Sequence, residues 1–230
     1  MSGRIFFVSG IDTGVGKTVA TGLMARYLIK RGVNVVTLKL VQTGNNGRSE
    51  DIETHRAIMG TGMIPEDEEG LTAPQIFRFP ASAHLAAKLE GKTLDLDKIR
   101  EAAHILADRF EIVLVEGAGG LAVPLTEDLL TVDFVRGEGW PVIMVTSGRL
   151  GSLSQTVLAL EAVAARGMRV VGTVYNWDPT TDPVIDSDTP RMIVKHLERL
   201  GHSISFVKVP RIGADNSQDV DFSSFFAEME

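Results

Sequence analysis

The chain has 230 residues, of which 44% are hydrophobic and 23% charged, a composition typical of a globular protein with one well-buried core. Its formal net charge of −7 argues against a nucleic-acid partner, because proteins that bind phosphate backbones normally carry a basic face. It contains no cysteine, which excludes disulfides, thiolate metal sites and a cysteine nucleophile. We therefore expect one domain over residues 1–230.

The N-terminus passes directly into a short strand pattern, without the apolar segment of a signal peptide. No run in the sequence approaches the ~20 apolar residues that cross a bilayer. These features predict a cytoplasmic protein without a membrane partner.

Short apolar runs alternate with helical patterns along the chain. Strands are expected at residues 4–10, 33–40, 111–117, 141–148, 169–176 and 204–210. Helices are expected at residues 17–32, 96–110, 152–167 and 189–201. The strand runs are almost continuously apolar, which is typical of strands covered on both faces. The alternation predicts an α/β fold with a mostly parallel, twisted sheet and helices on both faces.

Two segments, residues 60–75 and 177–190, are rich in Gly, Pro and acidic residues and are expected to be irregular. The acidic run from Glu66 to Glu69 is expected to be a solvated loop. Neither segment is long enough to link two domains.

A candidate phosphate-binding loop, "SGIDTGVGKT", follows the first strand and precedes the first helix. Five residues separate Gly10 from Gly16, one more than in the usual pattern. Loop amides and a helix N-terminus attract an anion, and glycine lets the backbone pass close to phosphate. Lys17 can reach the β- and γ-phosphates, and the Thr18 hydroxyl can bind Mg²⁺. The alternative is a Gly-rich turn that only caps a helix.

Two acidic residues are candidate ligands for a Mg²⁺ ion. Glu116 ends a buried strand and is followed by Gly-Ala-Gly-Gly, expected to be a turn, at the edge where ligands gather in open α/β sheets. Asp51 lies in "GRSEDIETHR", where it could instead satisfy the amides at a helix N-terminus. Glu53 and His55 nearby suggest a transition-metal site only weakly, and they are expected instead on an exposed helix face. Lys39 ends the second strand at the same edge, unless it is simply a solvated lysine.

These motifs together resemble the dethiobiotin synthetase family. The family's loop, Gly-X-Asp-Thr-X-X-Gly-Lys-Thr, contains the extra residue and is present as "GIDTGVGKT". Five further landmarks follow in the family's order, as "KLVQTG", "SEDIE", "VEGAGG", "LGSLSQ" and "GTVYN". The resemblance extends from residue 5 to about residue 212, and it implies a single domain of the phosphate-loop NTPase type.

The resemblance implies an ATP- and Mg²⁺-dependent carboxylation in biotin biosynthesis. CO₂ and 7,8-diaminononanoate give a carbamate, whose oxygen attacks the γ-phosphate of ATP to form a carbamic–phosphoric anhydride. The second amine then closes the ureido ring of dethiobiotin and expels phosphate. Such chemistry depends on positioning and charge neutralisation rather than on a protein nucleophile.

The resemblance also implies roles for individual residues. The catalytic residues would be Lys17, Lys39 and Thr13. The nucleotide would contact Gly14, Val15, Gly16, Lys17, Thr18, Val19, Glu116, Gly117, Ala118, Gly119, Asn176, Pro210, Arg211 and Ile212, with Asn176 at the adenine base. The diamino acid would contact Thr43, Lys39, Gly151 and Ser152, and the metal Thr18, Asp51 and Glu116. In the family the helix that starts at Gly151 belongs to the neighbouring subunit, so a homodimer is implied.

The sequence departs from the family pattern at four places. Leu40 replaces the usual proline after the lysine, and Gly14 stands where some members have an acidic residue. Glu50 is inserted before Asp51, and Trp177 follows Asn176 where a polar residue is expected.

Other phosphate-loop proteins are alternatives. A deviant phosphate-loop switch ATPase carries Lys after the first Gly, but this chain has Ile11. The amidotransferase-type synthases of cobalt-corrin assembly need a glutaminase domain with a cysteine nucleophile, and this chain has neither the length for that domain nor a cysteine. A nucleotide kinase normally brings an Arg-rich lid, whereas residues 177–190 contain no Lys or Arg. A non-catalytic ATP-binding scaffold stays open.

Overall fold

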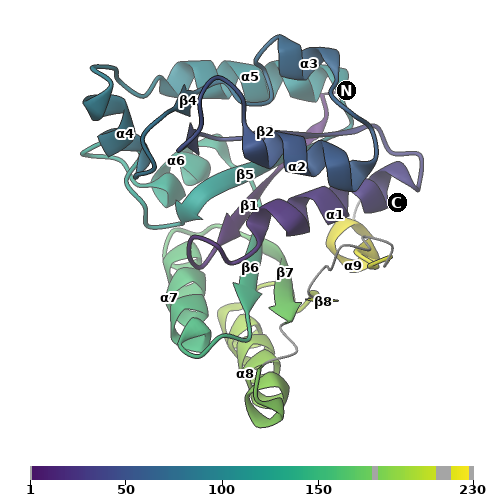
Figure 1. Ribbon diagram of the computed structural model, residues 1–230. Coiled ribbons are helices and arrows are strands. Elements are labelled where there is room, and N and C mark those ends of the chain that lie inside the picture. Colours follow the sequence, from purple (N-terminus) through teal and green to yellow (C-terminus); the bar gives the residue numbers. More distant parts are fainter. Residues whose placement is uncertain (1, 178–180, 211–218, 228–230) are drawn as a thin grey trace.

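Six parallel strands form the central sheet of the computed structural model, which describes residues 2–177, 181–210 and 219–227 (Figure 1). The strand order is β2-β5-β1-β6-β7-β8, and every neighbouring pair is parallel. The strands are β1 (Arg4–Gly10), β2 (Val35–Lys39), β5 (Ile112–Gly120), β6 (Val142–Ser147), β7 (Val170–Trp177) and β8 (Phe206–Pro210). The mostly parallel sheet expected from the sequence is confirmed.

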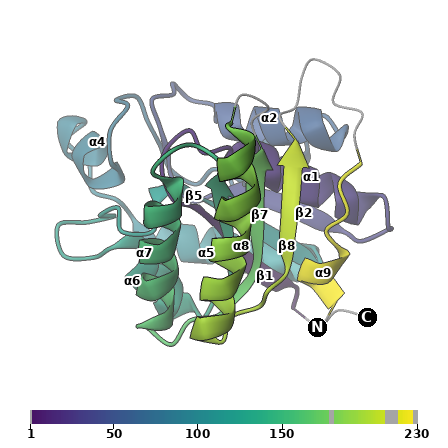
Figure 2. The ribbon, with the colours of Figure 1, turned by 90° about the horizontal axis from the view of Figure 1, so that it is seen from below.

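Helices cover both faces of this sheet. One face carries α1 (Lys17–Ile29), α2 (Glu50–Met59) and the short α9 (Ser223–Phe226). The other carries α4 (Ala83–Leu89), α5 (Leu96–Arg109), α6 (Thr131–Glu138), α7 (Ser152–Ala164) and α8 (Pro183–Leu200). In Figure 2, α7 and α8 lie in front of the sheet, and α1 and α2 lie behind it. None of the helices within the described residues has the length and apolar character needed to cross a membrane.

The strand sequences are continuously apolar because each strand contributes side chains to two separate hydrophobic cores, one on each face of the sheet. Phe6 and Val8 of β1 pack with α1, α2 and α9, whereas Phe7 between them packs with α5 and α6. All three side chains are buried. Alternate residues of a strand point to opposite faces, so a sheet covered on both sides requires apolar residues at every position.

Several expectations for the irregular segments were wrong. Residues 183–190 are helical, because α8 starts at Pro183, where proline is tolerated, and is capped by Asp182, which accepts a hydrogen bond from the Val184 amide. The acidic run is not wholly solvated. It forms α3 (Pro65–Glu68), in which the buried side chain of Asp67 accepts hydrogen bonds from Arg56 at 2.7 and 2.9 Å. A second sheet, which the sequence did not predict, pairs β3 (Gln42–Thr43) with β4 (Ile76–Phe77).

Candidate active site

The phosphate-loop motif connects β1 to α1 at the carboxyl edge of the sheet. β1 lies between β5 and β6 at the centre, where the connections of an open α/β sheet turn in opposite directions and ligands normally bind. Gly16 caps α1 with φ of 95°, and a Cβ added there would lie 2.3 Å from the Asn176 Nδ2 atom. Glycine is therefore required at this position by both backbone conformation and space.

Lys17 lies along this loop and is almost completely buried. Its ammonium donates a hydrogen bond to the Asp12 carbonyl oxygen at 2.9 Å. Burial, together with the nearby charge of Lys39, lowers the pKa of Lys17 to about 8. A buried cation that contacts a carbonyl rather than a carboxylate is poorly neutralised, so the loop is arranged to accept an anion.

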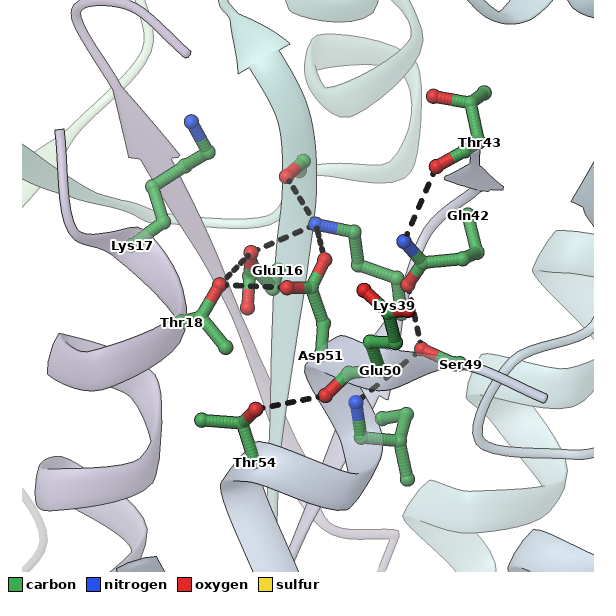
Figure 3. Close-up of polar contacts among 12 residues, drawn as sticks. Lys17, Thr18, Lys39, Gln42, Thr43, Ser49, Glu50, Asp51, Thr54 and Glu116 are labelled. Atoms are coloured by element: carbon green, nitrogen blue, oxygen red, sulfur yellow. Dashed lines mark hydrogen bonds and ion pairs between the residues drawn. The ribbon is translucent and has the colours of Figure 1, made fainter. Parts of the chain in front are cut away.

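Lys39 lies at the centre of a buried charged cluster (Figure 3). It ends β2, directly opposite Glu116 of β5, and its ammonium lies 2.7 Å from Glu116 Oε1 and 2.6 Å from Asp51 Oδ2. Burial opposes the charged lysine, but the two carboxylates outweigh it and raise the pKa of Lys39. Burial likewise opposes the charged Glu116, yet Lys39 and His55 lower its pKa to about 2. The sequence expectation that Lys39 and Glu116 meet at one edge of the sheet is confirmed.

Thr18 joins the same cluster from the first turn of α1. Its hydroxyl donates to Asp51 Oδ1 at 2.8 Å and to Glu116 Oε1 at 3.1 Å. Hydroxyl and carboxylate oxygens are the hard ligands that Mg²⁺ prefers. Among the described residues, no group of three or more His, Cys, Asp or Glu side chains could hold a metal. In nucleotide sites Mg²⁺ usually takes one or two carboxylates beside phosphate and water, and Thr18, Asp51 and Glu116 bring oxygens of this kind together.

His55 was expected on an exposed helix face, and this expectation was wrong. Its side chain is fully buried, with Nε2 2.7 Å from Glu116 Oε2, whereas Glu53 on the same helix is exposed. The sequence does contain a signal. His55 follows Asp51 by four residues, and residues spaced i and i+4 share one face of a helix.

β5 continues beyond Glu116, where the sequence predicted a turn. The strand extends to Gly120, which pairs with Gly10, and it includes Gly117, Ala118 and Gly119. At Gly117 an added Cβ would lie 2.7 Å from the ring of Phe7, so this glycine has a packing role. Its carbonyl oxygen also accepts a hydrogen bond from Lys39 at 3.2 Å.

The structure shows what Leu40 does at the position where the family usually has proline. Its backbone N–H donates to the Glu116 carbonyl oxygen at 2.9 Å, which extends the pairing of β2 with β5 by one bond. A proline has no N–H and could not make this bond. The buried Leu40 side chain also packs in the core beside Phe7.

A cleft of about 610 Å³ lies beside the phosphate loop. Its walls include Gly14, Val15, Val19, Asn176, Trp177 and Pro210. The Asn176 amide donates to the Val15 carbonyl oxygen at 2.5 Å, so this strand end holds the loop. Trp177 pairs with Pro210 across β7 and β8, and its ring forms part of the wall where a polar residue was expected. Arg211 and Ile212 lie outside the described residues.

The residues expected on the substrate side lie in the phosphate loop, in β3 and at the start of α7. Thr13 is exposed in the loop, and Thr43 is half-buried at the end of β3. Gly151 caps α7 as expected, with φ of 91°. Ser152 is buried, and both its hydroxyl and its N–H already donate, to the carbonyl oxygens of Ser147 at 2.5 Å and Arg149 at 3.0 Å.

Comparisons with known proteins agree with this geometry. A family model described as an AAA domain matches residues 4–214. ATP-dependent dethiobiotin synthetase BioD 2 of Pasteurella multocida is 42% identical over 88% of this chain and 95% of the relative. ATP-dependent dethiobiotin synthetase BioD of Chlorobaculum tepidum is 46% identical over 87% of this chain and 84% of the relative.

A solved structure of a ParA family ATPase from Chlorobium tepidum covers 97% of this chain and 89% of that chain, with a TM-score of 0.52. At 14% identity, this likeness shows the fold alone. The curated relatives carry the assignment, because their identity extends over most of both sequences. The chain belongs to the ATP-dependent dethiobiotin synthetase family.

Proposed function

We propose that this chain converts 7,8-diaminononanoate, CO₂ and ATP into dethiobiotin, ADP and phosphate, with Mg²⁺, and that residues 1–230 act as one domain. The observation that carries the proposal is the buried cluster of Lys39, Glu116, Asp51 and Thr18 directly beside Lys17 and its loop. Two lysines and hard oxygen ligands at one sheet edge are what a phosphoryl transfer between two anions requires.

ATP is proposed to place its base in the cleft and its phosphates on the loop. The cleft between Val19, Asn176 and Pro210 has a volume of about 610 Å³, which suits a nucleoside. Asn176 would contact the adenine, and Arg211 and Ile212 are proposed to complete this end of the site. Loop amides from Gly14 onward would donate to the phosphates.

Mg²⁺ would be held by Thr18, Asp51 and Glu116, and when bound it supplies positive charge to the phosphate oxygens. Lys39 then has a second role. Its ammonium already neutralises both carboxylates, and in the complex it would stabilise negative charge on the carbamate and on the transferred phosphoryl group. Lys17 would do the same from the loop side, with Thr13 as a hydroxyl toward the substrate.

The covalent steps need no protein nucleophile. A carbamate oxygen attacks the γ-phosphorus and ADP leaves; the second amine then attacks the carbamoyl carbon, a C–N bond forms, and phosphate leaves. The amine loses its proton in ring closure. The chain's contribution is to align the carbamate with the γ-phosphate between Lys17 and Lys39, and alignment of this kind removes much of an activation barrier.

The diamino acid is proposed to lie between two subunits. Thr43 would contact it from one protomer, and the N-terminus of α7 at Gly151 and Ser152 would attract its carboxylate from the other. Because the Ser152 hydroxyl is engaged internally, the helix end rather than this side chain would supply the attraction. Leu150, just before α7, is 85% exposed and Leu158, on α7, is 67% exposed, which supports a homodimer on this surface.

The proposed function is tested by measuring ADP release with Mg²⁺, bicarbonate and the diamine, omitting each in turn. The proposal requires that release falls to background when bicarbonate or the diamine is absent, and that dethiobiotin is formed mole for mole with ADP. ATP hydrolysis that ignores both co-substrates would instead indicate a switch ATPase. Light scattering of the purified chain and of Leu158→Glu tests the dimer separately.

A further inference from the structure

His55 is a buried histidine beside the charged cluster, and the proposed chemistry gives it no role. It lies on α2 one turn after Asp51, and its side chain is fully buried. Nε2 lies 2.7 Å from Glu116 Oε2. The other ring nitrogen, Nδ1, is buried and has no hydrogen-bond partner among the described residues.

The geometry fixes which nitrogen carries the hydrogen toward Glu116. Glu116 Oε1 accepts hydrogen bonds from the Lys39 ammonium at 2.7 Å and from the Thr18 hydroxyl at 3.1 Å, which are the contacts of a carboxylate, and carboxylate oxygens only accept. Nε2 therefore donates to Oε2 at 2.7 Å, and Nδ1 is buried without a hydrogen-bond partner among the described residues. The hydrogen bond from Nε2 to Glu116 Oε2 is thus the contact that the polar atoms of the His55 ring make among the described residues.

The two oxygens of Glu116 are then divided between different partners. Oε2 faces His55, whereas Oε1 faces Lys39 at 2.7 Å and Thr18 at 3.1 Å, on the side of Asp51. Without a donor at Oε2, a fully buried carboxylate would lack a partner on one oxygen or would rotate to find one. His55 therefore determines the orientation of the carboxylate plane.

We propose that His55 is a positioning residue for the metal site, holding Oε2 of Glu116 so that Oε1 is presented to the cation beside Asp51 and Thr18. The inference rests on the proposed function, because it needs Glu116 to be a metal ligand. One helix sets both parts of the arrangement, since Asp51 and His55 lie on the same face of α2. Donors of this kind, placed behind a ligand, are commonly needed for metal affinity.

The test compares His55→Leu, which keeps bulk but removes the donor, with His55→Gln, whose amide can donate from about the position of Nε2. ADP affinity is measured by calorimetry with Mg²⁺ and again with EDTA. The inference predicts that His55→Leu loses about 10- to 100-fold of affinity with Mg²⁺. Affinity in EDTA should stay unchanged, and His55→Gln should recover most of the loss.

His202→Leu is the matched control, because His202 also has a buried, unpartnered nitrogen, Nε2, but lies after α8. It should leave the effect of Mg²⁺ on ADP affinity intact. Wild-type affinity for His55→Leu with Mg²⁺ overturns the inference, as does equal loss in His55→Gln and His55→Leu. If wild-type protein itself gains no ADP affinity from Mg²⁺, the proposed metal site fails instead, which is a different result.

A second measurement reads the protonation of the His55 ring directly in the wild-type protein. Nitrogen-15 NMR of histidine-labelled protein reports which ring nitrogen of His55 carries hydrogen, with His55→Gln or His55→Leu spectra used for assignment where they fold. Hydrogen on Nε2 is expected. A neutral ring with hydrogen on Nδ1 alone would leave Glu116 without a donor and would overturn the inference.

Discussion

Lys39 and Glu116 face each other across β2 and β5, with Lys39 Nζ 2.7 Å from Glu116 Oε1 and with both side chains almost completely buried. The pairing follows from the sheet, because the two residues are partners in the parallel register. Asp51 from α2 and Thr18 from α1 close the cluster. Side chains from four elements, α1, β2, α2 and β5, thus meet at one buried ammonium, which balances the charge of the two carboxylates.

Lys39→Met should destabilise the protein by about 3–5 kcal/mol, because it leaves two carboxylates beside each other without their cation. The free energy of unfolding in urea at neutral pH measures this change. Lys30→Met is the matched control, since the Lys30–Asp219 pair is exposed and such pairs contribute about 0–1 kcal/mol. A Lys39→Met protein as stable as the control would contradict the structural role of the cluster.

Glu116→Gln should remove part of the acid sensitivity of folding. The pKa of Glu116 is lowered from 4.5 to about 2, so its contribution to stability is complete above pH 4.5 and is lost as the pH falls through 2. This contribution is roughly 3 kcal/mol. Urea unfolding at several pH values between 5 and 2.5 should show that the free energy of unfolding falls less steeply with decreasing pH in Glu116→Gln than in the wild-type protein. Glu53→Gln on the exposed face of α2 should keep the wild-type slope.

Lys17 should take up a proton when nucleotide binds at alkaline pH. In the free protein its pKa is lowered from 10.5 to about 8, so the folded chain holds fewer protons than the unfolded chain between these values. Phosphates favour the charged lysine, so binding near pH 9 should take up close to one proton, and affinity should fall as pH rises. Calorimetry in two buffers of different ionisation enthalpy measures the uptake. If Lys17→Met takes up the same number of protons on binding nucleotide, the uptake comes from another group.

Gly16→Ala should lower the free energy of unfolding more than Gly14→Ala does, although both glycines have positive φ. The strain of a left-handed alanine is about 1–2 kcal/mol at either position. Only at Gly16 does the added Cβ meet another group, the Asn176 amide at 2.3 Å, while nothing lies within 4 Å at Gly14. The additional loss of unfolding free energy in Gly16→Ala, measured with urea, should become smaller when Asn176 is also changed to Ala. An excess that persists in the double variant would refute this contact as its cause.

Much of the fold could be predicted from the sequence, because two-sided burial leaves a clear pattern in parallel strands. β1 was predicted with its observed bounds, and the convergence of Lys39 with Glu116 followed from the rule that parallel strands end at one edge. The start of α8 was missed, since the Pro and Asp residues that usually mark loops here occupy its first turn.

Two further errors, at His55 and Asp67, concern burial, which depends on tertiary packing. Both are polar residues in acidic stretches, and the identity of their buried partners, Glu116 and Arg56, cannot be read from the local sequence. The bond from the Leu40 amide to the Glu116 carbonyl likewise becomes visible only when the strands are paired. Spacing could have flagged His55, since Asp51 precedes it by one helical turn.

A crystal structure with Mg²⁺ and a non-hydrolysable ATP analogue would show whether both lysines and the metal ligands meet at one triphosphate. We expect the terminal phosphate within hydrogen-bond distance of both Lys17 and Lys39, with the metal on oxygens of Thr18, Asp51 and Glu116. A triphosphate bound elsewhere, or one whose terminal oxygens stay out of reach of Lys39, would contradict this expectation.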